Sequence, residues 1–261
     1  ASTGSGPPLV KTANWLNHLE FDWQSPVWRS LLLELSRHHR LIRYDQRGTG
    51  LTDWAVEDIS FDAWVSDLET VVNAAGLERF SLLGISQGTP VSIAYAVRHP
   101  ERVSRLILHG GYAKGWLVGE SPKAQRHQDA TRTLIESGWG QETPAFRQMF
   151  TSLFIPDGTP EQIAWFNELE RITTSPENAV RIFDVIPKVD ISALLPRVSV
   201  PTLVMHSRGD AVITHAAGRK KASMIPNAKF VTLESRNHLM LAHEPAFGRF
   251  LSEINDFAET A

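Results

Sequence analysis

The stretch "SLLGISQGTP", residues 81–90, places a serine between two glycines at the end of an apolar run. Residues 84–88 fit the pattern G-x-S-x-G, which chance produces only about 0.1 times in a chain of this length if glycine and serine are each near 7%. The apolar run predicts a strand before Ser86, and the residues after it predict a helix. A serine between a strand and a helix is typical of a nucleophile elbow, a sharp turn that presents a reactive hydroxyl.

The two glycines have a steric explanation, since side chains at these positions would collide with the neighbouring strand and helix. We expect Ser86 to adopt a positive φ angle, which lifts its hydroxyl above the carboxyl edge of the sheet. The backbone N–H of Gln87, at the start of the helix, is then free to bind an oxyanion. A simple strand-to-helix turn, with the serine as a helix cap, is the alternative interpretation.

Short apolar runs elsewhere in the chain predict the other strands. With the run before Ser86, they cover residues 8–13, 40–45, 80–85, 104–110, 201–207 and 228–234. Helical spacing of apolar residues occurs between most of these runs, at 27–39, 60–76, 88–100 and 245–259. This alternation predicts an α/β fold, with a mostly parallel sheet of about six strands covered by helices on both faces.

The alternation stops between about residues 112 and 190, where helical patterns occur without a clear strand. We therefore predict a core made of residues 1–112 and 191–261, with a helical cap insertion at 113–190. Aromatic side chains are frequent in this insertion, and most of them should pack in its own core. A few should form the roof of an apolar pocket over Ser86.

Composition excludes several classes of function. The 261 residues include no cysteine, which excludes disulfides, a thiol nucleophile and a thiolate metal site. The formal net charge of −3 gives no reason to expect a nucleic-acid partner. No apolar run approaches the roughly 18 residues of a membrane span, and the first residues do not resemble a secretory signal. We expect a cytoplasmic protein without a membrane partner, a metal or a cofactor.

A serine hydroxyl needs a base to accept its proton, and the base needs an acid to orient it. After an elbow of this kind the acid precedes the histidine in the chain. Asp210 follows the predicted strand 201–207, and His238 follows the strand 228–234. Both should lie at the same edge of the sheet as Ser86, so we predict His238 as general base and acid and Asp210 as its partner.

Other histidines and acids compete for these two roles. His206 lies in a strand and is expected to be a packed or hydrogen-bonded core residue, whereas His109 ends another strand and could line the site. Asp184 and Asp190 belong to the end of the insertion, and Glu234 is too close in sequence to His238. No grouping of His, Asp and Glu has convincing metal-ligand spacing.

At this point the chain resembles the α/β-hydrolase superfamily over nearly its whole length. Residues 44–53, "YDQRGTGLTD", look like a characteristic segment of that superfamily. Residues 12–53, 138–181 and 233–241 are most similar to bacterial hydrolase domains that often occur fused to helix-turn-helix regulators or to cyclase-type domains. The resemblance implies hydrolytic chemistry and does not define the substrate.

The resemblance also suggests an oxyanion loop after the strand 8–13. Many relatives have His-Gly or Pro-Gly there, whereas this chain has Ala13-Asn14. Asparagine is the residue other than glycine that best tolerates a left-handed backbone. We therefore assign the second oxyanion donor to the backbone N–H of Trp15, and we expect Asn14 and His18 to line the pocket.

Relatives begin with an antiparallel strand pair before the strand 8–13, and here only residues 1–7 precede it. We expect this N-terminal pair to be truncated and the strand 40–45 to lie near an uncovered edge. An uncovered edge can pair with a second chain. A homo-oligomer contact at this edge is therefore predicted.

These observations predict a serine hydrolase that cleaves small to medium carboxylic esters through an acyl-enzyme. The same three residues could instead act on a lactone, a thioester, a peracid or a carbon–carbon bond. A ligand-binding sensor with low turnover would also keep the fold and the triad. A fourth reading, an inactive scaffold, leaves the intact Ser, Asp and His unexplained.

Overall fold

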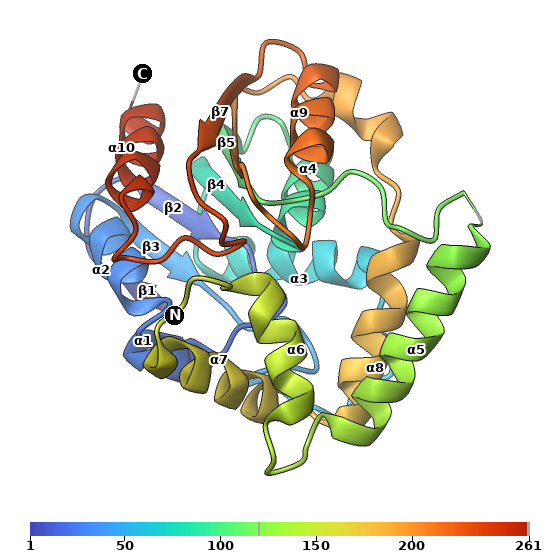
Figure 1. The fold of residues 1–261 in the computed structure, drawn as a ribbon. Helices are drawn as coiled ribbons and strands as arrows, with labels where there is room; N and C mark the ends of the chain where they lie inside the picture. The colour runs from blue at the N-terminus through green and yellow to red at the C-terminus, as the bar shows by residue number, and fades with distance from the viewer. Residues whose placement is uncertain (120, 260–261) are drawn as a thin grey trace.

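The computed structural model describes residues 1–119 and 121–259, and a seven-stranded sheet runs through its centre (Figure 1). The strand order is β1-β3-β2-β4-β5-β6-β7, in which β2 to β7 are parallel and β1 is antiparallel to β3. The strands are β1 Ser2–Thr3, β2 Pro8–Lys11, β3 Arg40–Arg43, β4 Phe80–Ile85, β5 Val103–His109, β6 Thr202–Ser207 and β7 Lys229–Leu233. All six predicted strands are present, so the predicted fold class is confirmed, with one short strand added.

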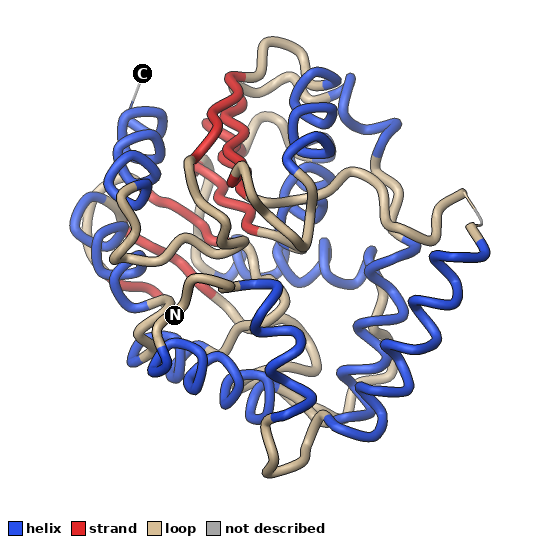
Figure 2. The backbone as a smooth tube through the Cα atoms, viewed as in Figure 1, coloured by secondary structure: helices blue, strands red, loops and turns tan. Residues whose placement is uncertain are grey.

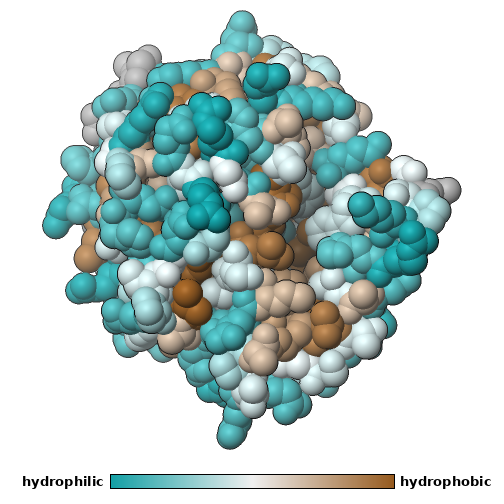
Figure 3. All heavy atoms as spheres, viewed as in Figure 1, coloured by the Kyte–Doolittle hydropathy of each residue, from teal (hydrophilic) through white to brown (hydrophobic). Residues whose placement is uncertain are grey.

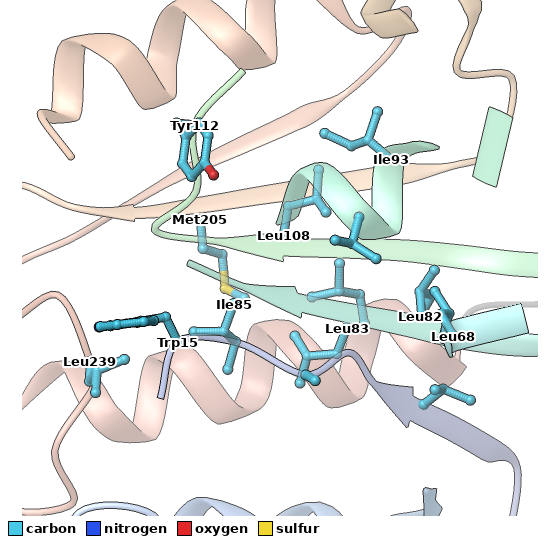
Figure 4. Close-up of a cluster of buried hydrophobic side chains, with 14 of the residues drawn as sticks. Trp15, Leu68, Leu82, Leu83, Ile85, Ile93, Leu108, Tyr112, Met205 and Leu239 are labelled. Carbon is cyan, nitrogen blue, oxygen red and sulfur yellow. The ribbon is translucent and has the colours of Figure 1, made fainter. Parts of the chain in front are cut away.

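The central strand β4 is buried at every residue. Its continuous apolar sequence follows from this position, because a parallel strand in the middle of a sheet has helices over both faces. Figure 4 shows Leu82 and Leu83 of β4 in one apolar cluster with Leu108 of β5 and Met205 of β6. The strand that leads into the turn at Ser86 is therefore fully enclosed by the hydrophobic core.

Helices cover both faces of the sheet, as Figure 1 shows. On one face α2 (Arg29–His38) packs against α10 (Ala246–Glu259), and the short α1 (Leu19–Gln24) lies beside α2. The other face is covered by helices α3 (Phe61–Ala74), α4 (Gly88–Arg98) and α9 (His215–Met224) and by the 3₁₀ turn η2 (Ser192–Arg197).

The ends of α3 show how local sequence places these helices. The hydroxyl of Ser60 accepts a hydrogen bond from the N–H of Ala63, which caps the first turn. Gly76 follows the helix with a φ of +64°. Both ends are those predicted from the sequence.

Between β5 and β6 the described residues form helices and loops (Figure 2). Four helices, here called the insertion helices, are α5 Pro122–Gly138, α6 Ala145–Phe154, α7 Pro160–Thr173 and α8 Pro176–Val185, and the 3₁₀ turn η1 (Ile186–Lys188) follows α8. Helix α5 packs on α8, and α6 packs on α7. Three of the four begin with a Ser or Thr cap followed by proline, a combination that fixes a helix start.

The expectation of an uncovered edge at β3 is wrong. Ser2 and Thr3 form β1 and pair with Ile42 and Leu41 of β3, and the side chain of Arg40 donates to the hydroxyl of Ser2 at 3.2 Å. The outermost strand therefore has only two residues, which leaves little backbone for a second chain to pair with. A contact between two copies at this edge stays a prediction.

No helix among residues 1–119 and 121–259 is both long and apolar enough to cross a membrane.

The two glycines Gly84 and Gly248 give a matched test of the packing around the elbow. A Cβ at Gly84 would lie 2.6 Å from the Ser92 hydroxyl and 2.8 Å from the Gly88 carbonyl oxygen, whereas a Cβ at Gly248, in α10, meets nothing within 4 Å. We predict that Gly84→Ala lowers the free energy of unfolding by ~1–3 kcal/mol. Gly248→Ala should raise it by ~0.5–1 kcal/mol. Urea unfolding measures both, and equal effects of the two variants would contradict this account.

Candidate active site

Ser86 occupies a strained turn between β4 and α4. Its φ angle is +53°, in the left-handed region that residues other than glycine rarely adopt. Its backbone N–H donates to the carbonyl of His109 at 2.9 Å, and its carbonyl accepts from the N–H of Thr89 at 3.0 Å. Gly88 is needed on the helix side, because a Cβ there would lie 2.9 Å from the carbonyl oxygen of Ala13. The turn therefore has the conformation predicted from the sequence.

The predicted partners of Ser86 meet it at the carboxyl edge of the sheet. The Ser86 hydroxyl lies 2.8 Å from Nε2 of His238, and Nδ1 of His238 lies 2.7 Å from Oδ2 of Asp210. Asp210 follows β6 and His238 follows β7. Because these strands are adjacent and parallel, both residues lie at the same edge of the sheet. All three side chains are buried. The three residues selected from the sequence therefore form one continuous series of hydrogen bonds in the structure.

The carboxylate of Asp210 is fixed by donors on both oxygens. The backbone N–H groups of Val212 and Ile213 donate to Oδ1 at 2.8 and 3.0 Å, while Oδ2 faces His238 and, at 3.3 Å, Nε2 of His206. Burial alone would raise the pKa of Asp210. The charge and hydrogen bond of His238, with the hydrogen bonds from His206 and Ile213, outweigh it and hold the pKa well below its usual range.

His109 supports the site from below. Its Nε2 lies 3.1 Å from the carbonyl oxygen of His238, and its ring packs on Phe250. The sequence suggested that His109 could line the site, but it is not among the residues that line the cavity. Burial, together with the nearby His206 and His238, lowers the pKa of His109 to about 3. A neutral His109 thus braces the loop that carries His238.

Trp15 and Gln87, whose N–H groups were predicted to bind an oxyanion, line the same cavity as Ser86. Among the described residues, no acceptor is found for either backbone N–H. The indole of Trp15 packs against Trp139 at the end of α5, with the two ring centroids 5.2 Å apart. Two residues with free backbone donors therefore line the cavity beside Ser86, and an oxyanion needs donors of this kind.

Neither Asn14 nor His18 lines the cavity, so the predicted lining roles of these residues are corrected. Asn14 is buried and its φ is not positive, and its side-chain oxygen accepts from Nζ of Lys11 at 2.5 Å. His18 caps α1, where its Nδ1 accepts from the N–H of Phe21 at 3.3 Å. Side-chain hydrogen bonds, and not a left-handed asparagine, hold the loop before Trp15.

A cavity of about 490 Å³ opens above Ser86. Its walls come from the insertion helices α5 and α6, from the loop after β5 and from residues 211–213, and they are mainly apolar. Among the described residues its lining includes no lysine or arginine. The lining residues from the stretch 112–190 are Tyr112, Trp116, His127, Ala130, Thr131, Leu134, Met149, Phe150, Leu153, Phe154, Phe183 and Ile186. The sequence predicted an apolar roof of this kind but could not select these residues.

The mouth of the cavity is apolar as well. Trp116, Leu134, Met149 and Leu153 line it and are each 37–42% exposed, which is unusual for such large hydrophobic side chains. Figure 3 shows hydrophobic side chains gathered around a hollow over α5 and α6. An apolar group bound at Ser86 could therefore extend outward without losing apolar contact.

A metal does not fit this site. Across residues 1–119 and 121–259, no group of three or more His, Asp and Glu side chains is placed to hold an ion. Both ring nitrogens of His238 are engaged by Ser86 and Asp210.

Comparison with known proteins connects this geometry to one family. Residues 23–245 match the model of the family described as alpha/beta hydrolase fold. The chain is 28% identical to a pimeloyl-[acyl-carrier protein] methyl ester esterase of Nitrosomonas europaea, over 91% of this chain and 90% of that protein. It is 27% identical to a 2-hydroxymuconate semialdehyde hydrolase of a Pseudomonas species, over 99% and 85%. An esterase structure from Exiguobacterium antarcticum superposes with a TM-score of 0.82 at 21% identity, covering 100% of this chain and 94% of that chain, and shows a shared fold.

The buried His109 generates a prediction about stability at low pH. Its folded pKa of about 3 lies below the ordinary histidine pKa of 6.5, so the unfolded chain takes up the proton first as the pH falls. His109 should therefore contribute a loss of stability below pH 6.5, with a slope of up to ~1.4 kcal/mol per pH unit. Thermal unfolding between pH 7 and 4 should show a smaller loss for His109→Gln than for the parent protein.

The matched control for this test is His38→Gln, at an exposed histidine. It should lose stability on acidification as steeply as the parent. The same steepness in His109→Gln would show that His109 is not the group being protonated.

Proposed function

The chain belongs to the alpha/beta hydrolase fold family, and on this basis we propose that it is a serine hydrolase that cleaves small to medium carboxylic esters through an acyl-enzyme. The observation that carries the proposal is the hydrogen-bonded series from Ser86 through His238 to Asp210, which opens into an apolar cavity. Ser86 is the nucleophile, His238 the general base and acid, and Asp210 the group that orients His238.

In the acylation step, Ser86 Oγ attacks the carbonyl carbon of the ester while His238 Nε2 accepts the hydroxyl proton. This requires the His238 tautomer whose Nδ1–H donates to Asp210, the tautomer that an ionised Asp210 favours. The N–H groups of Trp15 and Gln87 stabilise the oxyanion of the tetrahedral intermediate. When the intermediate collapses, the bond to the alcohol oxygen breaks and His238 delivers its proton to that oxygen.

Deacylation repeats the sequence with water in place of the serine. His238 Nε2 takes a proton from water, the resulting hydroxide attacks the acyl carbon, and the bond to Ser86 Oγ breaks as His238 returns the proton to it. The products are the carboxylic acid and the free enzyme. Because His238 is fully buried, water must reach it through the cavity above Ser86.

The lining of the cavity supports an uncharged substrate. An anionic group would lose its hydration there and find no lysine or arginine among the described lining residues, so uncharged acyl and alcohol groups are favoured. A relative whose name states a methyl ester esterase supports an ester as the scissile bond. A relative named as a semialdehyde hydrolase supports the alternative that the same triad acts on another bond.

Replacement of the nucleophile tests the proposal directly. We predict that Ser86→Ala lowers kcat/KM for p-nitrophenyl butyrate by on the order of 10³-fold or more, because the covalent step is lost. A fluorophosphonate probe should label the parent protein and not Ser86→Ala. Ser223→Ala, at an exposed serine on α9, serves as the control and should behave as the parent.

Two results would contradict different parts of the proposal. Labelling of Ser86 without turnover of any ester would support Ser86 as the nucleophile and would refute an ester as the substrate. A parent protein that is neither labelled nor active would refute a serine hydrolase and favour a binding role for the cavity.

The apolar mouth generates a prediction about chain length. Leu153 lines the mouth, whereas Leu51 is equally apolar, 55% exposed, and not among the cavity-lining residues. Leu153→Ser should lower the ratio of kcat/KM for the octanoate ester to that for the acetate ester by about tenfold, as loss of roughly 1.4 kcal/mol of apolar contact implies. Leu51→Ser should leave the ratio unchanged. The mouth would have no part in binding if both variants changed the ratio equally.

A further inference from the structure

Asp210 contacts a second histidine besides His238. His206, the penultimate residue of β6, is fully buried, and its Nε2 lies 3.3 Å from Asp210 Oδ2 and 2.8 Å from the carbonyl oxygen of Ile213. Both neighbours of this nitrogen are acceptors. Nε2 of His206 therefore carries a proton, which it donates to the Ile213 carbonyl, and this N–H lies 3.3 Å from the same carboxylate oxygen that holds His238.

The other ring nitrogen of His206 is enclosed without a partner. No described residue offers a hydrogen bond to its Nδ1. Helix α9 lies against it, where a Cβ at Gly218 would come within 2.2 Å of Nδ1. A proton on Nδ1 would be buried without an acceptor, which is costly. The surroundings thus favour the His206 tautomer with its proton on Nε2.

The titratable groups around His206 come from four elements. Asp210 lies in the loop after β6, His238 shares its carboxylate from the loop after β7, and His109 lies at the end of β5. His215, on α9, has its ring centroid 6.1 Å away and is itself hydrogen-bonded to Thr232. Among the described neighbours, only His206 and His238 place a side-chain donor on the carboxylate of Asp210.

We propose that His206 is a positioning residue that fixes the orientation of Asp210 and, through the polar Nε2–H that lies 3.3 Å from Oδ2, limits the negative charge that Asp210 presents to His238. The inference rests on the proposed function, in which His238 is the base. Without the His206 donor, Oδ2 would keep more of its charge facing His238 and would favour the imidazolium form. His238 would then stay protonated to higher pH, and less of the enzyme would hold the free base that Ser86 needs.

The link between Asp210 and Ile213 extends this role to the cavity. The same Nε2–H reaches the carbonyl of Ile213, while Asp210 Oδ1 accepts from the N–H groups of Val212 and Ile213. Val212 and Ile213 both line the cavity. His206 therefore holds together the acid of the triad and one wall of the substrate site.

The test compares His206→Leu, which removes the donor, with His206→Gln, whose side-chain N–H can replace it. The rate of ester turnover and, independently, the rate at which a fluorophosphonate labels Ser86 are measured from pH 5 to 9. We expect the acidic limb of both profiles to move up by about half to one pH unit in His206→Leu, as loss of one hydrogen bond to a charged group implies. His206→Gln should restore the limb toward its parental position.

His215→Gln is the matched control, because this neighbouring histidine makes no contact with Asp210, and it should leave the limb in place. A loss of rate in His206→Leu without any movement of the limb would mean that His206 only supports the fold and would overturn the proposal. An equal shift in His206→Leu and His206→Gln would overturn it too, since the donor would not be the cause.

A measurement on the parent protein covers the case in which His206→Leu does not fold. Nitrogen-15 NMR of histidine-labelled protein, with the signals of residue 206 assigned by their loss in His206→Gln, reports the tautomer directly. We expect the neutral ring to carry its proton on Nε2. A neutral ring with its proton on Nδ1 would refute the proposal. Failure of the proposed function is distinct, because it would appear as a parent protein without turnover and without labelling.

Discussion

The left-handed backbone at Ser86 is the constraint on which the rest of the structure depends. A φ of +53° at a serine is unfavourable on its own, and it persists because buried β4 enters the turn, α4 leaves it, and Gly84 and Gly88 allow close approach on either side. The turn places the hydroxyl 2.8 Å from Nε2 of His238, and the N–H of Gln87 that follows has no acceptor among the described residues. One strained residue therefore sets the position of both the proposed nucleophile and the proposed oxyanion donor next to it.

The insertion helices do more than cover this turn, because they contact the parts that would perform the chemistry. The carbonyl of Phe154, at the end of α6, accepts the backbone N–H of His238 at 2.8 Å, and the Phe154 ring meets the imidazole edge-on with the ring centroids 5.2 Å apart. Trp139 of the same insertion packs on Trp15. A movement of these helices would therefore alter the base and the oxyanion loop together with the cavity.

The parts of the site that sequence could predict are those governed by local rules. Ser86, Asp210 and His238 each follow a recognisable strand, and parallel strands end at one edge, so their meeting was foreseeable. The short β1 was missed because two residues carry no periodic signal. The roles of Asn14, which is hydrogen-bonded to Lys11, and of His206, which lies 3.3 Å from Asp210, depend on side chains that only the tertiary fold brings together.

The most direct test of the central claim is to trap the acyl-enzyme. The protein is mixed with excess p-nitrophenyl butyrate, quenched with acid within the first turnovers, and examined by mass spectrometry of the intact chain and of its peptides. The account predicts a burst of p-nitrophenol and a mass increase of one butyryl group on the peptide that contains Ser86. Turnover without any adduct, or with the adduct on another residue, would contradict it.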